Sequence, residues 1–245
     1  MTLALPRRAS AEFAGTALLV AAVVGSGIAA ARLSPGDVGL QLLENAIATA
    51  LALGALILTF GPVSGAHFNP IVSAVDWWLG RRAGTGLTGR DLPAYVAAQV
   101  GGAIIGAVLA DLMFDLPAVT WSRTGRVGGN LWLAEVVATA GLVVLVFALA
   151  RSGRTSAAPA AVGAYIGAAY WFTSSTSFAN PAVTIGRAFT DTFAGIAPAS
   201  VPGFIAAQLV GGVVAIAAIA AWYPHAADTA GAVVVPHLTQ ETEAR

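Results

Sequence analysis

The chain has 245 residues, of which 57% are hydrophobic and only 10% are charged, and its mean hydropathy is +0.78. This composition is far more apolar than that of an average soluble domain and predicts a membrane protein. The net charge is zero, and the 12 basic residues are all arginines spread thinly along the chain, so nucleic acid is not an expected partner. With no cysteine and three scattered histidines, we expect no metal site, no cofactor and no thiol nucleophile.

Six apolar stretches reach the length of about 20 residues that a helix needs to cross the hydrocarbon core of a bilayer. An even number of crossings puts both termini on one side of the membrane. The positive-inside rule then predicts cytoplasmic termini, because eight arginines fall on that side and three on the other, in a multi-pass protein of the inner or plasma membrane. The six stretches are residues 11–31, 39–60, 92–114, 131–150, 158–176 and 201–222.

Two further apolar pieces, residues 69–79 and 180–190, are too short to cross a bilayer, and each begins with an Asn-Pro pair. Asn is a good helix N-cap and Pro fits the first helical position, so each pair predicts a helix start. About 11 residues at 1.5 Å per residue reach only about 16 Å, half the membrane. We therefore expect two re-entrant half-helices, with the loops before them, 61–68 and 173–179, lining a watery cavity.

The chain contains an internal repeat with halves at about residues 10–115 and 131–222. Each half has three spans, and an odd number forces the halves to be inverted relative to each other, so that the half-helices meet N-terminus to N-terminus. We expect one all-α membrane domain over residues 1–223, followed by a polar tail, 224–245. The matching segments are Ala11–Ala17 with Ala134–Ala140, Asn69-Pro70 with Asn180-Pro181, and Ala97-Ala98-Gln99 with Ala206-Ala207-Gln208.

The motifs Ser64-Gly65-Ala66-His67-Phe68-Asn69-Pro70 and Asn180-Pro181-Ala182, set in an inverted repeat, resemble those of the aquaporin and aquaglyceroporin family over residues 10–222. The first copy departs from the family's Asn-Pro-Ala by having Ile71 in third place. The resemblance implies six transmembrane helices plus two half-helices and a channel rather than an enzyme. It also implies a homotetramer in the lipid bilayer, with a separate pore for small neutral solutes and water in each subunit.

The two asparagines of these motifs are expected to act at the centre of the pore. Two facing helix N-termini each carry roughly half an elementary positive charge, which disfavours cations there. Asn69 and Asn180 would cap the helices with their side-chain oxygens and donate from their NH2 groups to a passing water or hydroxyl. The resemblance further implies a ladder of pore-lining carbonyls from Gly65, Ala66, His67, Phe68, Thr176, Ser177, Phe178 and Ala179; the His67 side chain either lines the pore or braces its loop.

Two carboxylates lie at equivalent repeat positions, Glu12 and Glu135, near the ends of apolar spans. An intramembrane ionisable residue is by default a functional hypothesis, and proton relay is one reading. We favour the other reading, in which each carboxylate accepts from backbone amides of a re-entrant loop and holds it in place. Gln99 and Gln208 are given the same bracing role.

The resemblance also locates the filter, a constriction that in this family includes an Arg directly after the second Asn-Pro-Ala. Here that position is Val183, and ungapped counting from the asparagines gives Thr49, Ala168 and Ser177 as the other three residues. Four small uncharged side chains predict a wider and less polar opening than a water-selective filter has. Arg187, one turn after Val183, either replaces the missing guanidinium or pairs with loop groups, and we favour the pairing.

These features predict a passive channel for small uncharged solutes such as glycerol-like polyols, with water as an accompanying permeant. The Val183 filter and the segment Thr184–Arg187 resemble bacterial aquaglyceroporins found with arsenic-resistance functions, which makes arsenite and methylated arsenicals candidate solutes. The alternative is a secondary transporter built on an inverted repeat. A membrane enzyme has no support, because no span carries clustered histidines or paired carboxylates.

Overall fold

The computed structural model describes residues 3–223, and over this range the fold is built from α-helices, short 3-10 turns and loops. Six helices are long and two, α3 and α7, are short. The predicted tail, 224–245, lies outside the described residues. The long helices are α1 (Leu5–Leu33), α2 (Val38–Ser64), α4 (Leu92–Met113), α5 (Gly129–Arg151), α6 (Ala158–Phe172) and α8 (Val201–Trp222), and the short ones are α3 (Pro70–Gly80) and α7 (Pro181–Gly186).

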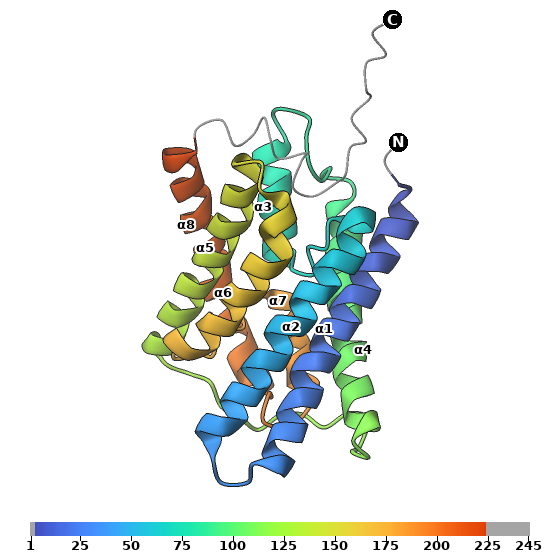
Figure 1. Cartoon of the computed structure of the whole chain (residues 1–245), viewed down its shortest axis with the longest axis vertical. Helices are drawn as coiled ribbons and strands as arrows, with labels where there is room; N and C mark the ends of the chain where they lie inside the picture. Colours follow the sequence, from blue (N-terminus) through green and yellow to red (C-terminus); the bar gives the residue numbers. More distant parts are fainter. Residues whose placement is uncertain (1–2, 224–245) are drawn as a thin grey trace, which may run out of the picture.

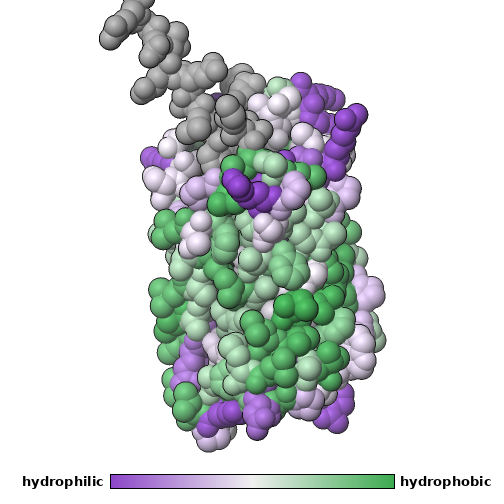
Figure 2. All heavy atoms as spheres, turned by 90° about the vertical axis from the view of Figure 1, so that its right-hand side faces the viewer, coloured by the Kyte–Doolittle hydropathy of each residue, from purple (hydrophilic) through white to green (hydrophobic). Residues whose placement is uncertain are grey.

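The long helices run roughly alongside one another in a bundle with two distinct ends (Figure 1). We call the end that holds the start of α1 and the end of α8 the terminal end; it also carries the 81–91 and 152–157 connections. The opposite, distal end carries the connection 34–37 and the segment 114–128 (Figure 1). Figure 2 shows a hydrophobic band between two more hydrophilic ends, as a membrane-spanning protein requires.

Among residues 3–223, five helices are long and apolar enough to span a membrane: α1, α2, α4, α5 and, with the turn before it, α8. The sixth expected span differs from its prediction, because α6 has 15 residues and stops at Phe172 rather than at 176. It stops there because Thr173 has an extended backbone, φ −110° and ψ 136°, and it cannot resume because Thr176, Ser177 and Ala179 adopt left-handed angles, φ of 60°, 50° and 47°. A 3-10 turn, Thr155–Ala157, extends α6 at its other end.

The two short helices begin at the predicted Asn-Pro pairs. The Asn69 side chain accepts a hydrogen bond from the Ile71 amide at 2.9 Å, and the Asn180 side chain accepts from the Ala182 amide at 3.0 Å. Helix α3 runs toward the terminal end, and α7 lies in the distal half of the bundle (Figure 1). The second piece is divided, because a 3-10 turn, Arg187–Phe189, replaces the last α-helical turn expected to reach residue 190.

Close helix pairs hold the bundle together, and each half contributes an equivalent one: α1 packs on α4, and α5 packs on α8. Small residues allow this approach. A Cβ atom placed on Gly102 of α4 would collide with the carbonyl oxygen of Phe13 in α1. The next glycine back, Gly101, has room, since its Cβ would lie 3.5 Å from the Phe13 ring.

This difference predicts unequal effects of two neighbouring substitutions. Gly102→Ala forces α1 and α4 apart and should destabilise the protein by about 1–3 kcal/mol, the usual cost of overpacking. Gly101→Ala is the matched control and should leave stability near that of the wild type. Thermal unfolding of the purified protein in detergent measures both, and equal midpoints for the two variants would contradict the packing described here.

Candidate functional site

The loop before α3 is held by the carboxylate of Glu12 in α1, which is fully buried. Its Oε1 accepts from the Ser64 hydroxyl at 2.6 Å and from the His67 amide at 3.0 Å. Its Oε2 accepts from the Phe68 amide at 2.7 Å and from the Gln99 side chain at 2.8 Å. Both oxygens of Glu12 therefore make two hydrogen bonds each, which offsets the cost of burying the carboxylate.

The loop before α7 repeats the arrangement around Glu135 of α5. Here Oε1 accepts from the Ser175 hydroxyl at 2.6 Å and from the Phe178 amide at 2.9 Å. Oε2 accepts from the Ala179 amide at 2.8 Å and from the Gln208 side chain at 2.6 Å. The two carboxylates thus occupy the bracing position that we favoured over proton relay.

Both loops have the same unusual backbone. Counting back from the capping asparagine, the first, third and fourth residues have positive φ in each loop, and only one of these six residues is glycine. Left-handed backbone at a non-glycine residue costs of order 1–3 kcal/mol, so the surrounding hydrogen bonds must hold it. The residues are Phe68, Ala66 and Gly65 in the first loop and Ala179, Ser177 and Thr176 in the second.

The two half-helices are joined to each other through their asparagines. Nδ2 of Asn69 donates to the carbonyl of Ala179 at 2.8 Å, and Nδ2 of Asn180 donates to the carbonyl of Phe68 at 2.7 Å. Each cap therefore bonds to the residue just before the opposite cap. This reciprocal pair fixes the two helix N-termini face to face, as the inverted repeat predicted, and it uses the carbonyls of Phe68 and Ala179.

A cavity of about 580 Å³ runs past this junction. Its walls are mainly aliphatic side chains of α1, α2, α5 and α6, and both asparagines reach it. Of the expected carbonyl residues, Thr176 lines a second, smaller cavity instead, and Ala179 lines neither of the two. The polar or loop residues on the wall of the larger cavity include Thr49, Gly65, Ala66, His67, Phe68, Asn69, Ser177, Phe178, Asn180 and Arg187.

His67 takes part in both expected roles. Its Nδ1 lies 2.8 Å from the hydroxyl of Ser73, which also accepts a hydrogen bond from Gln99, so the ring braces α3. Its Nε2 has no protein partner among the described residues, and the side chain lines the larger cavity. The other loop has no equivalent group, since Phe178 occupies the matching position.

The expected filter positions need one correction. Thr49, Ser177 and Val183 line the larger cavity, but Ala168 does not; it is exposed on the far side of α6. Tyr170 lies about 200° around the helix from Ala168, lines the cavity, and its hydroxyl is 3.2 Å from that of Thr49. Ungapped counting missed Tyr170 because it measures chain length, not helix rotation. The spacing of four that links Val162, Ile166 and Tyr170 is the signal that would have found it.

Arg187 is the second residue that changes the expected opening. It is 3% exposed and lines both cavities. Its Nε donates to the carbonyl of Ala194, and its guanidinium carbon lies 3.5 Å from the centre of the Phe178 ring. The favoured pairing with loop groups thus coexists with a place on the cavity wall. The expectation of four small uncharged side chains is therefore wrong, because the Tyr170 ring and the Arg187 side chain line the same cavity wall as Thr49, Ser177 and Val183.

The bracing geometry yields a stability prediction for Glu135→Gln. The new amide NH2 cannot accept the two hydrogen bonds that one carboxylate oxygen receives, and each buried donor left unpaired costs about 1–3 kcal/mol. The thermal midpoint in detergent should fall by several degrees.

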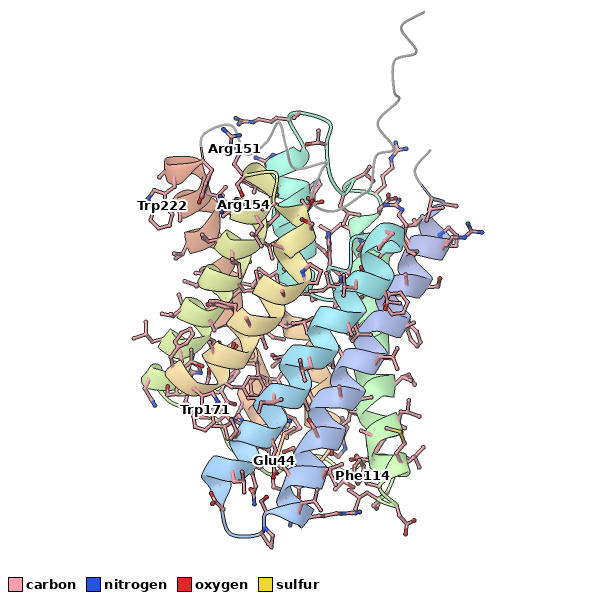
Figure 3. All side chains as sticks on the ribbon, in the orientation of Figure 1. Glu44, Phe114, Arg151, Arg154, Trp171 and Trp222 are labelled. Carbon is pink, nitrogen blue, oxygen red and sulfur yellow. The ribbon has the colours of Figure 1, made fainter. Side chains whose placement is uncertain are left out.

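The matched control is Glu44→Gln, near the distal end of α2 (Figure 3). One oxygen of Glu44 accepts a single hydrogen bond, from Ser34, and the other has no protein partner among the described residues. The control should unfold close to the wild-type midpoint. A Glu135→Gln protein as stable as the control would contradict the bracing role.

The chain is similar in sequence to known membrane channels. It is 55% identical over 213 residues to the aquaglyceroporin AqpS of Rhizobium meliloti (strain 1021), covering 87% of this chain and 88% of that protein. It is 31% identical over 224 residues to the glycerol uptake facilitator protein of Pseudomonas aeruginosa, covering 79% and 77%.

The X-ray structure of the aquaglyceroporin from Plasmodium falciparum has the same fold. It superposes with a TM-score of 0.64 over 90% of this chain and 97% of that one, at 20% identity. The major intrinsic protein family matches residues 1–179. With the spans, the paired Asn-Pro caps and the cavity beside them, these matches show that the chain belongs to the major intrinsic protein family, as a multi-pass membrane channel and not an enzyme.

Proposed function

We propose that this chain conducts glycerol-sized uncharged solutes in preference to water, with polyols, arsenite and methylated arsenicals as the candidate solutes. The observation that carries the proposal is the larger cavity, in which aliphatic walls face the polar groups of Asn69, Asn180, Thr49 and Ser177. Such a surface suits a solute with hydroxyls on one side and an apolar body. Relatives named as an aquaglyceroporin and as a glycerol uptake facilitator give independent support.

Cations are excluded at the junction of the two half-helices in this proposal. Two helix N-termini meet there, and each carries roughly half a positive elementary charge. Asn69 and Asn180 each donate one side-chain amide hydrogen to a carbonyl of the opposite loop. The second amide hydrogen of each side chain remains to donate to the oxygen of a passing water or solute. A water that accepts from these amides cannot also accept from the next water, so a continuous proton-conducting chain is broken.

In this proposal, four residues on the wall of the larger cavity select solutes by size, and we call them the ring: Thr49, Tyr170, Ser177 and Val183. The hydrogen bond between Thr49 and Tyr170 ties α2 to α6 and limits how far the opening can spread. Val183, where the family has Arg, supplies an apolar methyl surface and no charge. Compared with a ring that carries Arg at position 183, this ring leaves more room for a carbon-bearing solute, because the guanidinium of Arg187 is held back by the Ala194 carbonyl and the Phe178 ring.

We further propose a homotetramer in the inner membrane with cytoplasmic termini. Arg151 and Arg154 lie with Trp222 at the terminal end (Figure 3), and most of the other arginines of the described residues also fall there. Such an excess marks the cytoplasmic side. The tetramer is proposed from the resemblance to the family alone.

Restoring the family's charge at position 183 tests the filter. Val183→Arg should lower glycerol permeability by roughly tenfold or more, and water permeability by much less, because a long charged side chain removes the room a larger solute needs. Stopped-flow swelling of proteoliposomes with water, glycerol, urea and arsenite measures both.

Val183→Thr, which keeps the shape and adds no charge, serves as the control and should conduct like the wild type. If Val183→Arg reduces water and glycerol permeability by the same factor, the size-selective role of this ring is refuted.

A further inference from the structure

The smaller cavity, of about 200 Å³, lies beside the distal end of the larger one, and its wall contains two arginines. Arg187 belongs to both cavities, and Arg126, from the 114–128 segment, belongs to the smaller one. Thr176 and Asn45 add polar groups to the same wall. A space of this size holds a small ion with several waters, since a water takes about 30 Å³ in the liquid.

The two guanidinium groups are anchored in the same way. Nε of Arg126 donates to the carbonyl of Gly195 at 3.0 Å, and Nε of Arg187 donates to the carbonyl of the preceding residue, Ala194. Both also lie against the ring of Phe178, with guanidinium carbons 5.0 Å and 3.5 Å from its centre. Two adjacent carbonyls and one ring therefore hold both groups at the same place.

Most of the outer nitrogens of these groups remain without a protein partner. Nη1 of Arg126 reaches the carbonyl of Ser175 only at 3.5 Å, and neither Nη2 of Arg126 nor either Nη of Arg187 has a hydrogen bond to the described residues. Guanidinium nitrogens can only donate, and in this cavity a ligand or water must accept from them.

The positive charge at this place is not balanced by an ion pair. The two ion pairs among the described residues lie elsewhere, at Arg8 with Asp91 and at Arg123 with Asp191. Burial lowers the pKa of Arg126, and the charge of Glu135 partly opposes that effect. Glu135 is one carboxylate against two arginines, and its four hydrogen bonds go to other groups.

We propose that Arg126 and Arg187 form a binding site for a small oxyanion such as inorganic phosphate, and that the bound anion obstructs passage between the two cavities. Guanidinium groups match oxyanions with paired, charge-assisted hydrogen bonds. The Nε anchors leave the outer edges of both groups for that purpose. The obstruction rests on the proposed channel function, whereas the binding itself does not.

Binding is tested first, on the purified full-length protein in detergent. Titration calorimetry with sodium phosphate, against sodium chloride at equal ionic strength, should show saturable binding of phosphate alone. Arg126→Gln and Arg187→Gln should each weaken it roughly tenfold through loss of a charge-assisted contact. Arg123→Gln is the matched control on the same segment, because its side chain is 89% exposed and pairs with Asp191; it should bind like the wild type.

A wild-type protein that binds no phosphate, or an Arg123→Gln change that weakens binding as much as the other two, would overturn the site. The wild-type titration decides this even if a variant fails to fold. The conservative changes Arg126→Lys and Arg187→Lys keep the charge but lose the Nε anchor and the paired donors. They should also weaken binding, and undiminished affinity in both would contradict the guanidinium geometry.

Obstruction is tested separately, by swelling of proteoliposomes with phosphate on the distal side. Phosphate should slow both water and glycerol several-fold in the wild type and in Arg123→Gln, but not in Arg187→Gln. Saturable binding without any slowing would refute the obstruction alone. Absent permeation in phosphate-free buffer would refute the proposed channel function and leave the binding result standing.

Discussion

The structure depends on satisfying the hydrogen bonds of non-helical backbone at membrane depth, where the bilayer offers an unpaired amide no water. Two fully buried carboxylates, Glu12 and Glu135, meet this requirement. Each accepts two loop amides, a serine hydroxyl and a glutamine amide, in the same pattern. Because each carboxylate accepts four hydrogen bonds, its geometry fits the role of holding its loop.

Everything at the centre of the molecule follows from these two supports. They hold the left-handed loop residues, the loops set the positions of Asn69 and Asn180, and the asparagines bond across to the opposite loops. The cavity passes the place where the two helix N-termini meet. A cavity beside half-helices that are bonded to each other and braced from both sides fits the channel family to which the chain belongs.

The two half-helices could be predicted from the sequence because their starts depend on local chemistry. An Asn-Pro pair caps a helix wherever it occurs, and its repetition before two short apolar pieces predicted both half-helices. Counting along the chain did not give the rotation of α6 about its own axis, and Tyr170 therefore replaces Ala168 on the cavity wall; only the spacing of four from Val162 through Ile166 to Tyr170 carries that information in the sequence. The place of Arg187 depends on Ala194 and Phe178, which a count along the chain cannot bring together.

The central claim is that solutes cross a fixed path without energy coupling, and the concentration dependence of glycerol entry into proteoliposomes tests it most directly. Initial rates should rise in proportion to the glycerol gradient and stay the same when a proton gradient is imposed in either direction. Rates that saturate at low glycerol concentration and change with the proton gradient would contradict the channel and assign Glu12 or Glu135 a coupling role.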